Sequence, residues 1–319
     1  MWRAHLASMM TDLNFTPCQA DPDVWMQPAV KPDGTKCYEY VLIYVNDILV
    51  ISHRASTITD NLSALYHLKE NPSNGKRYGT PDCYLGANIG LYTLPGNTSG
   101  KQKWYMSSDD YVAYAIKNVE GKLTEANRWL CVKVSTPMTV GYRPELDMTR
   151  LLSDEQAKYF QNLIGVLRWA VELGQIDIHV EVAMLSSYLA QPRQGHLEAV
   201  FHIFVYLQKY KRSKVVFDDT CVNWGNKFQA VDWKDFYLET SELIPPNVPK
   251  PCGKCVQLNC FVDADHAGNQ ITRCSHTGVL LFVCRVPIIW YSKQQNMVKT
   301  STTSGLELIA TILFIFLYP

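Results

Sequence analysis

The chain has 319 residues, enough for two or three domains of ordinary size, and 47% of its residues are hydrophobic. That fraction can build packed cores, which excludes an intrinsically disordered protein. Thirty basic residues balance thirty acidic ones, which excludes a surface that is basic throughout but leaves local basic patches open.

The first 120 residues predict alternating helices and hairpins. Apolar periodicity and β-rich runs indicate helices over 6–13, 59–68 and 110–119, a strand at 24–26 and hairpins over 38–51 and 84–106. The first hairpin carries Asn46 and Asp47 at its polar tip. Ser107-Ser108-Asp109 predicts the cap of the third helix.

Residues 153–212 are expected to be helical. Ser153 followed by two acidic residues marks a helix start. Three apolar stripes then predict three helices, of which the second ends near Pro192 and the third ends in Lys209, Lys211 and Arg212. Such stripes are buried only against one another or a neighbouring sheet, so a helical bundle is expected.

The last third of the chain predicts a linker and a new domain. Periodicity is poor over about 215–254, and the proline-rich run 245–251 is typical of a semi-extended linker. Strands over 258–262, 277–283 and 288–291 and then a helix are expected. The fold class is therefore α+β, in four parts: 1–107, a helical region 108–214, a linker 215–256 and a C-terminal α/β domain 257–319.

Ten cysteines occur, and the first residues lack the apolar run of a secretory signal, so a reducing compartment is expected. Cys252, Cys255, Cys260 and His266 leave two interpretations open, a zinc site or free thiols. Free thiols are favoured because no second ligand pair follows. The apolar run 308–319 is shorter than the roughly 20 residues that cross a bilayer and predicts a core helix. A membrane-tethered protein is the weaker alternative.

The first motif with chemical meaning is Tyr44-Val45-Asn46-Asp47. Polynucleotide synthesis by the two-metal route needs carboxylates around two Mg²⁺ ions about 4 Å apart, and a hairpin tip can present them. The motif resembles the Tyr-x-Asp-Asp hairpin of reverse transcriptases. Its surroundings resemble copia-type retrotransposon polyproteins, through residues 19–25, 84–86 and 163–170. Taken without its neighbours, Asn46-Asp47 indicates only a tight turn. The surrounding sequence is what favours descent from this family.

The resemblance implies a partial reverse-transcriptase palm over 1–107 and a thumb or connection region over 108–214. It implies Asp47 as a catalytic, metal-binding residue and Tyr44 as a nucleic-acid contact. The family has Asp where this chain has Asn46, and its third metal-binding Asp lies upstream of residue 1. Mg²⁺ prefers anionic oxygen, so DNA synthesis is expected to be absent.

A second motif surrounds Asp263, in Cys260-Phe261-Val262-Asp263-Ala264-Asp265-His266. With the runs 272–278, 287–294 and 299–310 it resembles the RNase H domain of copia-type polyproteins over three strands and the start of a helix. The resemblance implies Asp263 and Glu307 as catalytic residues and Mg²⁺ ligands, and a truncated, inactive nuclease, since the family's two other Asp residues follow that helix. Asp265 and His266 are interpreted as strand-end, hydrogen-bonding residues.

The implied partners are an RNA template, a DNA primer or an RNA–DNA hybrid, with dNTPs as the only small substrates. Mg²⁺ is the implied cofactor, no membrane partner is expected, and the implied location is the cytoplasm or nucleus. The basic residues suited to phosphate contact are Lys101, Lys103, Lys209, Lys211, Arg212 and Lys214. A solvated face explains the same charges. Two hypotheses follow: an inactive remnant of a polymerase with RNase H, or a non-catalytic relic that binds nucleic acid.

Overall fold

The computed structural model describes residues 2–45, 47–68, 79–96, 100–130, 134–225 and 248–296. Helices and strands are mixed along the chain, as the sequence predicts. Two compact units form, Met1–Tyr84 with Val222–Cys255 and Leu85–Cys221 with Val256–Pro319. The four-part division stays a prediction. No helix in the described ranges is long and apolar enough to span a membrane.

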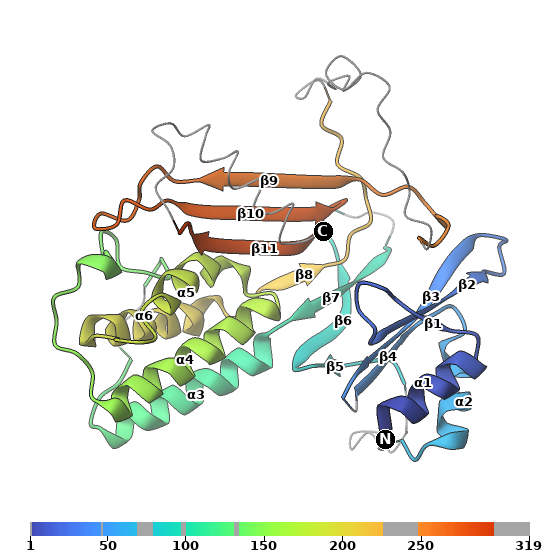
Figure 1. Cartoon of the computed structure of the whole chain (residues 1–319), viewed down its shortest axis with the longest axis horizontal. Coiled ribbons are helices and arrows are strands. Elements are labelled where there is room, and N and C mark those ends of the chain that lie inside the picture. The colour runs from blue at the N-terminus through green and yellow to red at the C-terminus, as the bar shows by residue number, and fades with distance from the viewer. Residues whose placement is uncertain are drawn as a thin grey trace. The chain divides into compact units, whose positions relative to one another are not determined.

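The first unit contains an antiparallel sheet and two helices (Figure 1). The helices are α1 (Trp2–Asp12) and α2 (Ala55–Leu65). The strands, in sheet order, are β1 (Thr16–Pro17), β2 (Val24–Val30), β3 (Lys36–Tyr44) and β4 (Asp47–Ile51). The short strand β5 (Cys83–Tyr84) ends the first segment of this unit.

One face of this sheet carries the core of the unit. Trp25 and Val41 lie opposite each other on β2 and β3, and both are buried. They share a cluster with buried side chains of both helices: Leu6, Met9, Met10, Phe15, Ile58 and Leu62. The predicted apolar stripe of the first helix is thus confirmed. The second helix begins four residues earlier than predicted, because Thr59 does not cap it but bonds the Ala55 carbonyl from within.

A buried carboxylate lies on the same face. Glu39 is opposite Gln27 in the β2–β3 register, and its side chain is fully buried. It accepts hydrogen bonds from Gln27 Nε2 at 2.7 Å, Ser52 Oγ at 2.5 Å and Arg54 Nη2 at 3.0 Å. Burial raises the pKa of Glu39, but the bonds from Arg54, Ser52 and Gln27 outweigh burial and leave the pKa below its usual 4.5. Glu39 therefore ties β2 and β3 to the connection between β4 and α2.

Replacing Glu39 with Gln should destabilise the chain by about 2–4 kcal/mol at pH 7, because Arg54 loses its buried partner. The lowered pKa means that the stabilising effect is complete above pH 4.5 and is lost as pH falls through the folded-state value. Urea unfolding of wild type and variant should therefore converge in acid. Asp12→Asn, at an exposed position of the same unit, is the control and should stay within about 0.5 kcal/mol of wild type. If the difference in unfolding free energy between wild type and Glu39→Gln stayed constant down to pH 3, this role of Glu39 would be contradicted.

The second unit combines a small sheet with a helical bundle. Strands β6 (Ala87–Thr93), β7 (Gln102–Ser107) and β8 (Lys214–Val216) are antiparallel neighbours in that order. The helical elements are α3 (Asp109–Glu125), η1 (Pro144–Leu146), α4 (Asp154–Glu172), η2 (Ile176–Ile178), α5 (His179–Ser186) and α6 (Gln194–Tyr210). β8 lies partly in the predicted linker. Its three residues are too few to show periodicity in the sequence, but Val215 is buried against Gly174.

The helix starts and ends follow local hydrogen bonds. Ser153 forms the predicted cap of α4, a capping box with Gln156. Ser108 does not cap α3 through its side chain, which instead donates to Gln175 Oε1 at 3.4 Å. α3 runs six residues past its predicted end at residue 119, because Leu123 is buried in the bundle core. α5 stops at Ser186, before the predicted end near residue 192, and residues 192–194 then pair with residues 150–152.

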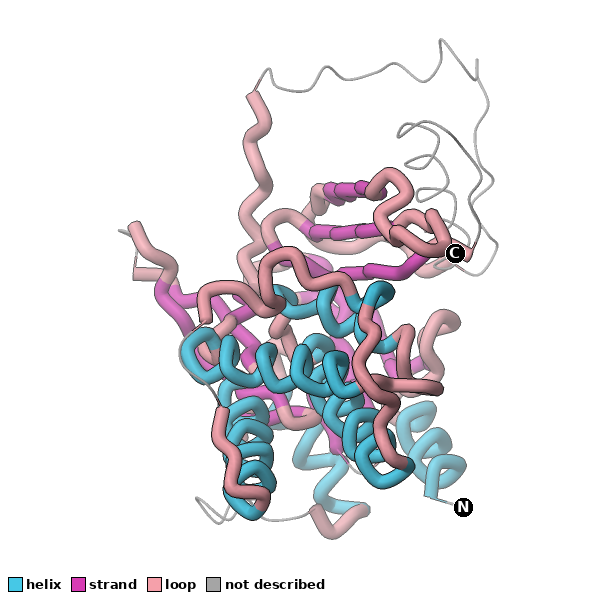
Figure 2. The backbone as a smooth tube through the Cα atoms, turned by 90° about the vertical axis from the view of Figure 1, so that its left-hand side faces the viewer, coloured by secondary structure: helices cyan, strands magenta, loops and turns pink. Residues whose placement is uncertain are grey.

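The C-terminal strands group with the bundle in the second unit. β9 (Leu258–Ala264), β10 (His276–Val283) and β11 (Val286–Gln294) form an antiparallel sheet in the order β11-β10-β9, which confirms the three predicted strands. The β10–β11 turn is Cys284-Arg285, so Val286 and Pro287 belong to the strand rather than to the predicted connection. Figures 1 and 2 both place these strands along the bundle, and Trp290 of β11 packs against its core. The helix predicted after them lies outside the described residues.

Candidate functional site

The first predicted site lies at the β3–β4 turn. Tyr44 pairs with Asp47, so Asp47 is the first residue of β4 and does not lie at the tip of the hairpin, where the sequence predicted it. Val45 has a φ of 54°, an unfavourable value for a β-branched residue. Directly paired residues share one face of a sheet, so Tyr44 and Asp47 lie side by side, both exposed. Asn46 lies outside the described residues.

Asp47 has two neighbours that the sequence did not indicate as site residues. Burial raises the pKa of the Tyr84 hydroxyl, and the negative charges of Asp47 and Asp21 raise it further. The two carboxylates therefore act on one hydroxyl in the first unit. These three residues come from separate segments, and no spacing motif links them, so only folding brings them together.

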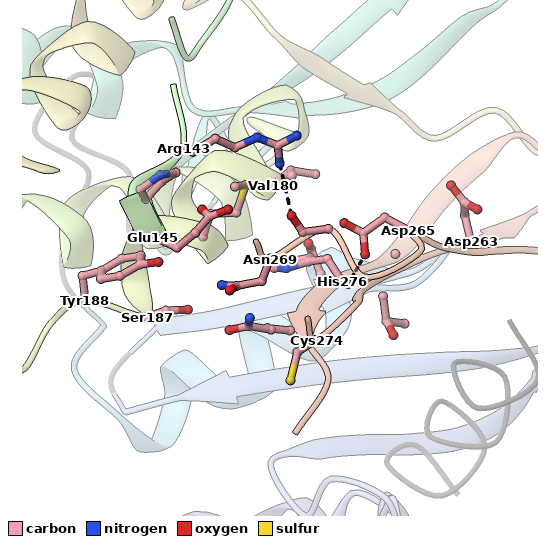
Figure 3. Close-up of a pocket in the computed structure, with 17 residues that line it drawn as sticks. Arg143, Glu145, Val180, Ser187, Tyr188, Asp263, Asp265, Asn269, Cys274 and His276 are labelled. Atoms are coloured by element: carbon pink, nitrogen blue, oxygen red, sulfur yellow. Dashed lines mark hydrogen bonds between the residues drawn. The ribbon is translucent and has the colours of Figure 1, made fainter. Parts of the chain in front are cut away.

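The second predicted residue, Asp263, lines a pocket of about 310 Å³ in the second unit (Figure 3). Asp263 is exposed near the end of β9, and its Oδ1 accepts a hydrogen bond from the Ala264 N–H at 2.9 Å. One wall of the pocket comes from η1 and α5, and the other comes from the β9–β10 connection and β11. The volume is at the lower end for small-molecule sites.

Hydrogen bonds hold the two walls together. Arg143 Nη1 donates to the Gly268 carbonyl at 3.4 Å, and the Gln270 N–H donates to Glu145 Oε1 at 3.2 Å. Asp265 accepts a hydrogen bond from the His276 N–H, and its own N–H donates to the His276 carbonyl at 3.1 Å. Asp265 therefore closes the β9–β10 loop, which confirms its interpretation as a strand-end, hydrogen-bonding residue.

Two histidines, His179 of α5 and His276 of β10, are close enough for the charge of one to affect the other. The Nε2 atoms of His179 and His276 are buried and have no hydrogen-bond partner among the described residues. Burial lowers the pKa of His179, and the nearby His276 and Arg168 lower it further. Burial also lowers the pKa of His276, against the opposing charge of Asp265. The arrangement favours neutral imidazoles.

Acidification should therefore destabilise the second unit. The folded-state pKa values lie below the usual 6.5, so the unfolded chain binds more protons below pH 6.5 and stability falls as pH drops through that value. Urea unfolding between pH 7.5 and 5.5 should show this loss, and His276→Gln should make the loss smaller, with the contribution of His179 remaining. His266→Gln, at an exposed position of the same loop, should keep the wild-type slope. An equal slope in both variants would show that His276 is not responsible.

The predicted basic residues have different surroundings. Lys103 is paired with Asp219, and Asp218 lies 3.5 Å away. The Lys214 ammonium lies 4.4 Å from the centre of the Tyr105 ring, so this cation packs on the β6–β7 hairpin. At the end of α6, Lys209 and Arg212 are exposed and Lys211 is half-buried, with no ion pair among the described residues.

Metal-binding groups are sparse in the described ranges. They contain no cluster of three or more His, Cys, Asp or Glu side chains that could hold a metal ion. Cys252 and Cys255 belong to the first unit, whereas Cys260 and His266 belong to the second. The choice between a zinc site and free thiols stays a prediction. Glu307 lies outside the described residues.

Comparison with known proteins gives one consistent group. A putative transposon Ty5-1 protein of Saccharomyces cerevisiae is 26% identical over 92% of this chain. The retrovirus-related Pol polyproteins from transposon RE1 of Arabidopsis thaliana and transposon TNT 1-94 of Nicotiana tabacum are 21% and 23% identical over 95% and 97% of it. The chain is related to retrotransposon polyproteins.

This relationship covers very different shares of the relatives. The retrotransposon-related chain spans 77% of the yeast protein but only 17% and 20% of the two plant polyproteins. No protein-family model matches the chain, and no solved structure matches it. The comparisons thus establish a retroelement-derived chain.

Proposed function

We propose that this chain is the reverse-transcriptase and RNase H region of a copia-type polyprotein, and that it no longer catalyses DNA synthesis. The observation that carries the proposal is the β3–β4 hairpin, which presents Tyr44 and Asp47 together on one exposed face. Asn46 stands where the resembled family has the first Asp of the Tyr-x-Asp-Asp motif, and Asp47 matches the second. The hairpin scaffold is thus retained, while its charge is reduced.

The donor set around Asp47 does not fit a two-magnesium centre. Such a centre needs several anionic oxygens around two ions about 4 Å apart. Near Tyr84 the carboxylates are Asp21 and Asp47, and the described residues bring no third acidic, His or Cys side chain into a metal-binding group there. Neutral Asn46 is a poor replacement, because Mg²⁺ favours anionic oxygen. We therefore assign no metal-dependent step to this hairpin.

The RNase H half of the proposal rests on β9–β11 and on Asp263. Three antiparallel strands with an acidic residue near the end of the first agree with the arrangement that the resemblance implies. Asp263 and Asp265 both line the pocket, and Asp265 also accepts a hydrogen bond from the His276 N–H. Glu145 and Asp265 line the same pocket but already accept hydrogen bonds from the N–H groups of Gln270 and His276, and the described residues form no metal-binding cluster there. We therefore propose that this half also lacks cleavage activity.

An RNA template labelled at one end and annealed to a DNA primer that carries a different end label tests both halves in one reaction with Mg²⁺ and dNTPs. Neither primer extension nor cutting of the RNA strand should exceed the level of a reaction without protein. Asp47→Ala and Asp263→Ala provide the controls and should match wild type. Extension that disappears in Asp47→Ala, or cutting that disappears in Asp263→Ala, would contradict the inactive assignment for that half.

A second candidate function, binding of nucleic acid without catalysis, is favoured by the end of α6. Lys209, Lys211 and Arg212 are grouped there without an ion pair in the described parts of the chain, unlike Lys103. Cations at a helix C-terminus also interact favourably with the helix dipole, so the same residues have a structural alternative. Separate measurements of affinity and of stability distinguish the two roles.

Replacing Lys209, Lys211 and Arg212 together with Gln should weaken binding of an RNA–DNA hybrid. The slope of log affinity against log salt concentration should fall by about 1 for each lost phosphate contact. Fluorescence anisotropy at several salt concentrations measures both effects, and thermal unfolding checks stability. Lys117, Lys122 and Lys158, three exposed cations on α3 and α4, changed to Gln give a control with the same loss of charge. An equal loss of affinity in both triple variants would refute a specific contact at the end of α6.

A further inference from the structure

Two thiols that are distant in sequence lie in contact in the second unit. The Sγ atoms of Cys221 and Cys284 are 3.6 Å apart, although 63 residues separate them. Cys284 is 2% exposed, whereas Cys221 is exposed. In the described parts of the chain no other pair of cysteine sulfurs makes such a contact. An S–S bond is about 2.05 Å long, so the two atoms need to approach by about 1.5 Å.

The backbone around Cys284 holds its sulfur in place. Cys284 occupies the β10–β11 turn with a φ of 54°, and its N–H donates to the Gln257 carbonyl at 2.6 Å. The Asn259 side-chain amide donates to the Cys284 carbonyl at 3.3 Å. These bonds fix the turn against the residues that lead into β9.

The segment that carries Cys221 is fixed against the same turn. The Arg285 N–H donates to the Asp218 carbonyl at 3.4 Å, and the Arg285 guanidinium lies 3.7 Å from the Asp218 carboxylate. Asp218 in turn caps the turn before Cys221 by accepting bonds from Thr220. Both sulfurs are therefore positioned by separate hydrogen bonds rather than by their own contact alone.

The Cys221–Cys284 pair lies where the chain leaves the second unit. The chain leaves the second unit after Cys221 and returns to it at Val256, one residue before Gln257. Cys284 contacts both the residue before the chain leaves and a residue just after it returns. A bond between the sulfurs would link both ends of the segment 222–255 to a single turn.

We propose that Cys221 and Cys284 form a reversible disulfide that fastens the β10–β11 turn to the point where the chain leaves the second unit. With a small disulfide as oxidant, the exposed Cys221 thiolate attacks one sulfur of the oxidant and releases one thiol. The Cys284 thiolate then attacks the Cys221 sulfur and releases the second thiol. The two cysteines lose two protons and two electrons, and the oxidant is reduced to two thiols.

The hydrogen bond between the thiols sets the conditions for this step. That bond, and then burial, raises the pKa of the Cys221 thiol above its usual 9.0, so the protonated form predominates near neutral pH. Only the thiolate is nucleophilic, so oxidation should accelerate as pH rises from 7 to 9. The proposal does not depend on the retroelement function, because it concerns only the local geometry of the second unit.

Mapping of the disulfide tests the proposal on the full chain. Reduced protein is incubated with oxidised glutathione at pH 8, alkylated, and digested with trypsin without reduction. The expected product joins the peptide of residues 215–227 to the peptide of residues 274–285. Fragment ions must then assign the bond to Cys284 rather than to Cys274, which lies in the same peptide. Alkylation of both Cys221 and Cys284, or a bond from Cys221 to another cysteine, would overturn the proposal.

Variants separate the bond from general oxidation. Cys221→Ser, at an exposed position, should abolish the linked peptide and the rise in melting temperature that oxidation produces in wild type. Cys260→Ser, also exposed and in the same unit, should retain both. A rise in melting temperature that persists in Cys221→Ser would refute the fastening role, even if the linked peptide forms in wild type.

Discussion

The arrangement of the second unit depends on the burial of the apolar stripes of four helices. Phe160 and Phe204, from α4 and α6, are fully buried, and side chains of α3 and α5 join them in one core. Removal of this apolar surface from water stabilises the bundle. The same core fixes the directions of η1, α5 and the end of α6. Both the wall of the Asp263 pocket and the basic end of α6 are therefore consequences of packing.

Two buried polar groups, one in each unit, connect helices and strands at their boundaries. Glu39 joins β3 to the start of α2 through Arg54 and Ser52. His196 accepts a bond from the Arg193 N–H and contacts the Pro144 carbonyl at 3.0 Å, which joins the start of α6 to η1. Such groups cost free energy unless they are hydrogen-bonded, so their partners are fixed in place. They specify how helices and strands connect, which apolar contacts alone do not.

Each of the two motifs that resemble catalytic sites contributes one of its predicted carboxylates within the described residues. Asp47 and Asp263 are each presented on an ordered strand, yet neither belongs to a metal-binding cluster in the described ranges. Strand pairing requires only backbone bonds and alternating side chains, so a hairpin scaffold persists when its catalytic side chains change. A chain that is related to retrotransposon polyproteins and carries Asn46 is therefore expected to keep the hairpin even where the acidic side chain is missing.

The sequence by itself determined the elements whose signals are local. The stripes of α1, α4 and α6, the β3–β4 and β6–β7 hairpins, the three C-terminal strands and the capping box at Ser153 all follow from spacing along the chain. Tertiary structure decided whatever required distant residues to meet. The groups Tyr84 with Asp47 and Asp21, His179 with His276, and Cys221 with Cys284 join residues that no periodicity relates. Even the end of α3 differs from prediction, because burial of Leu123 in the bundle core decides where this helix stops.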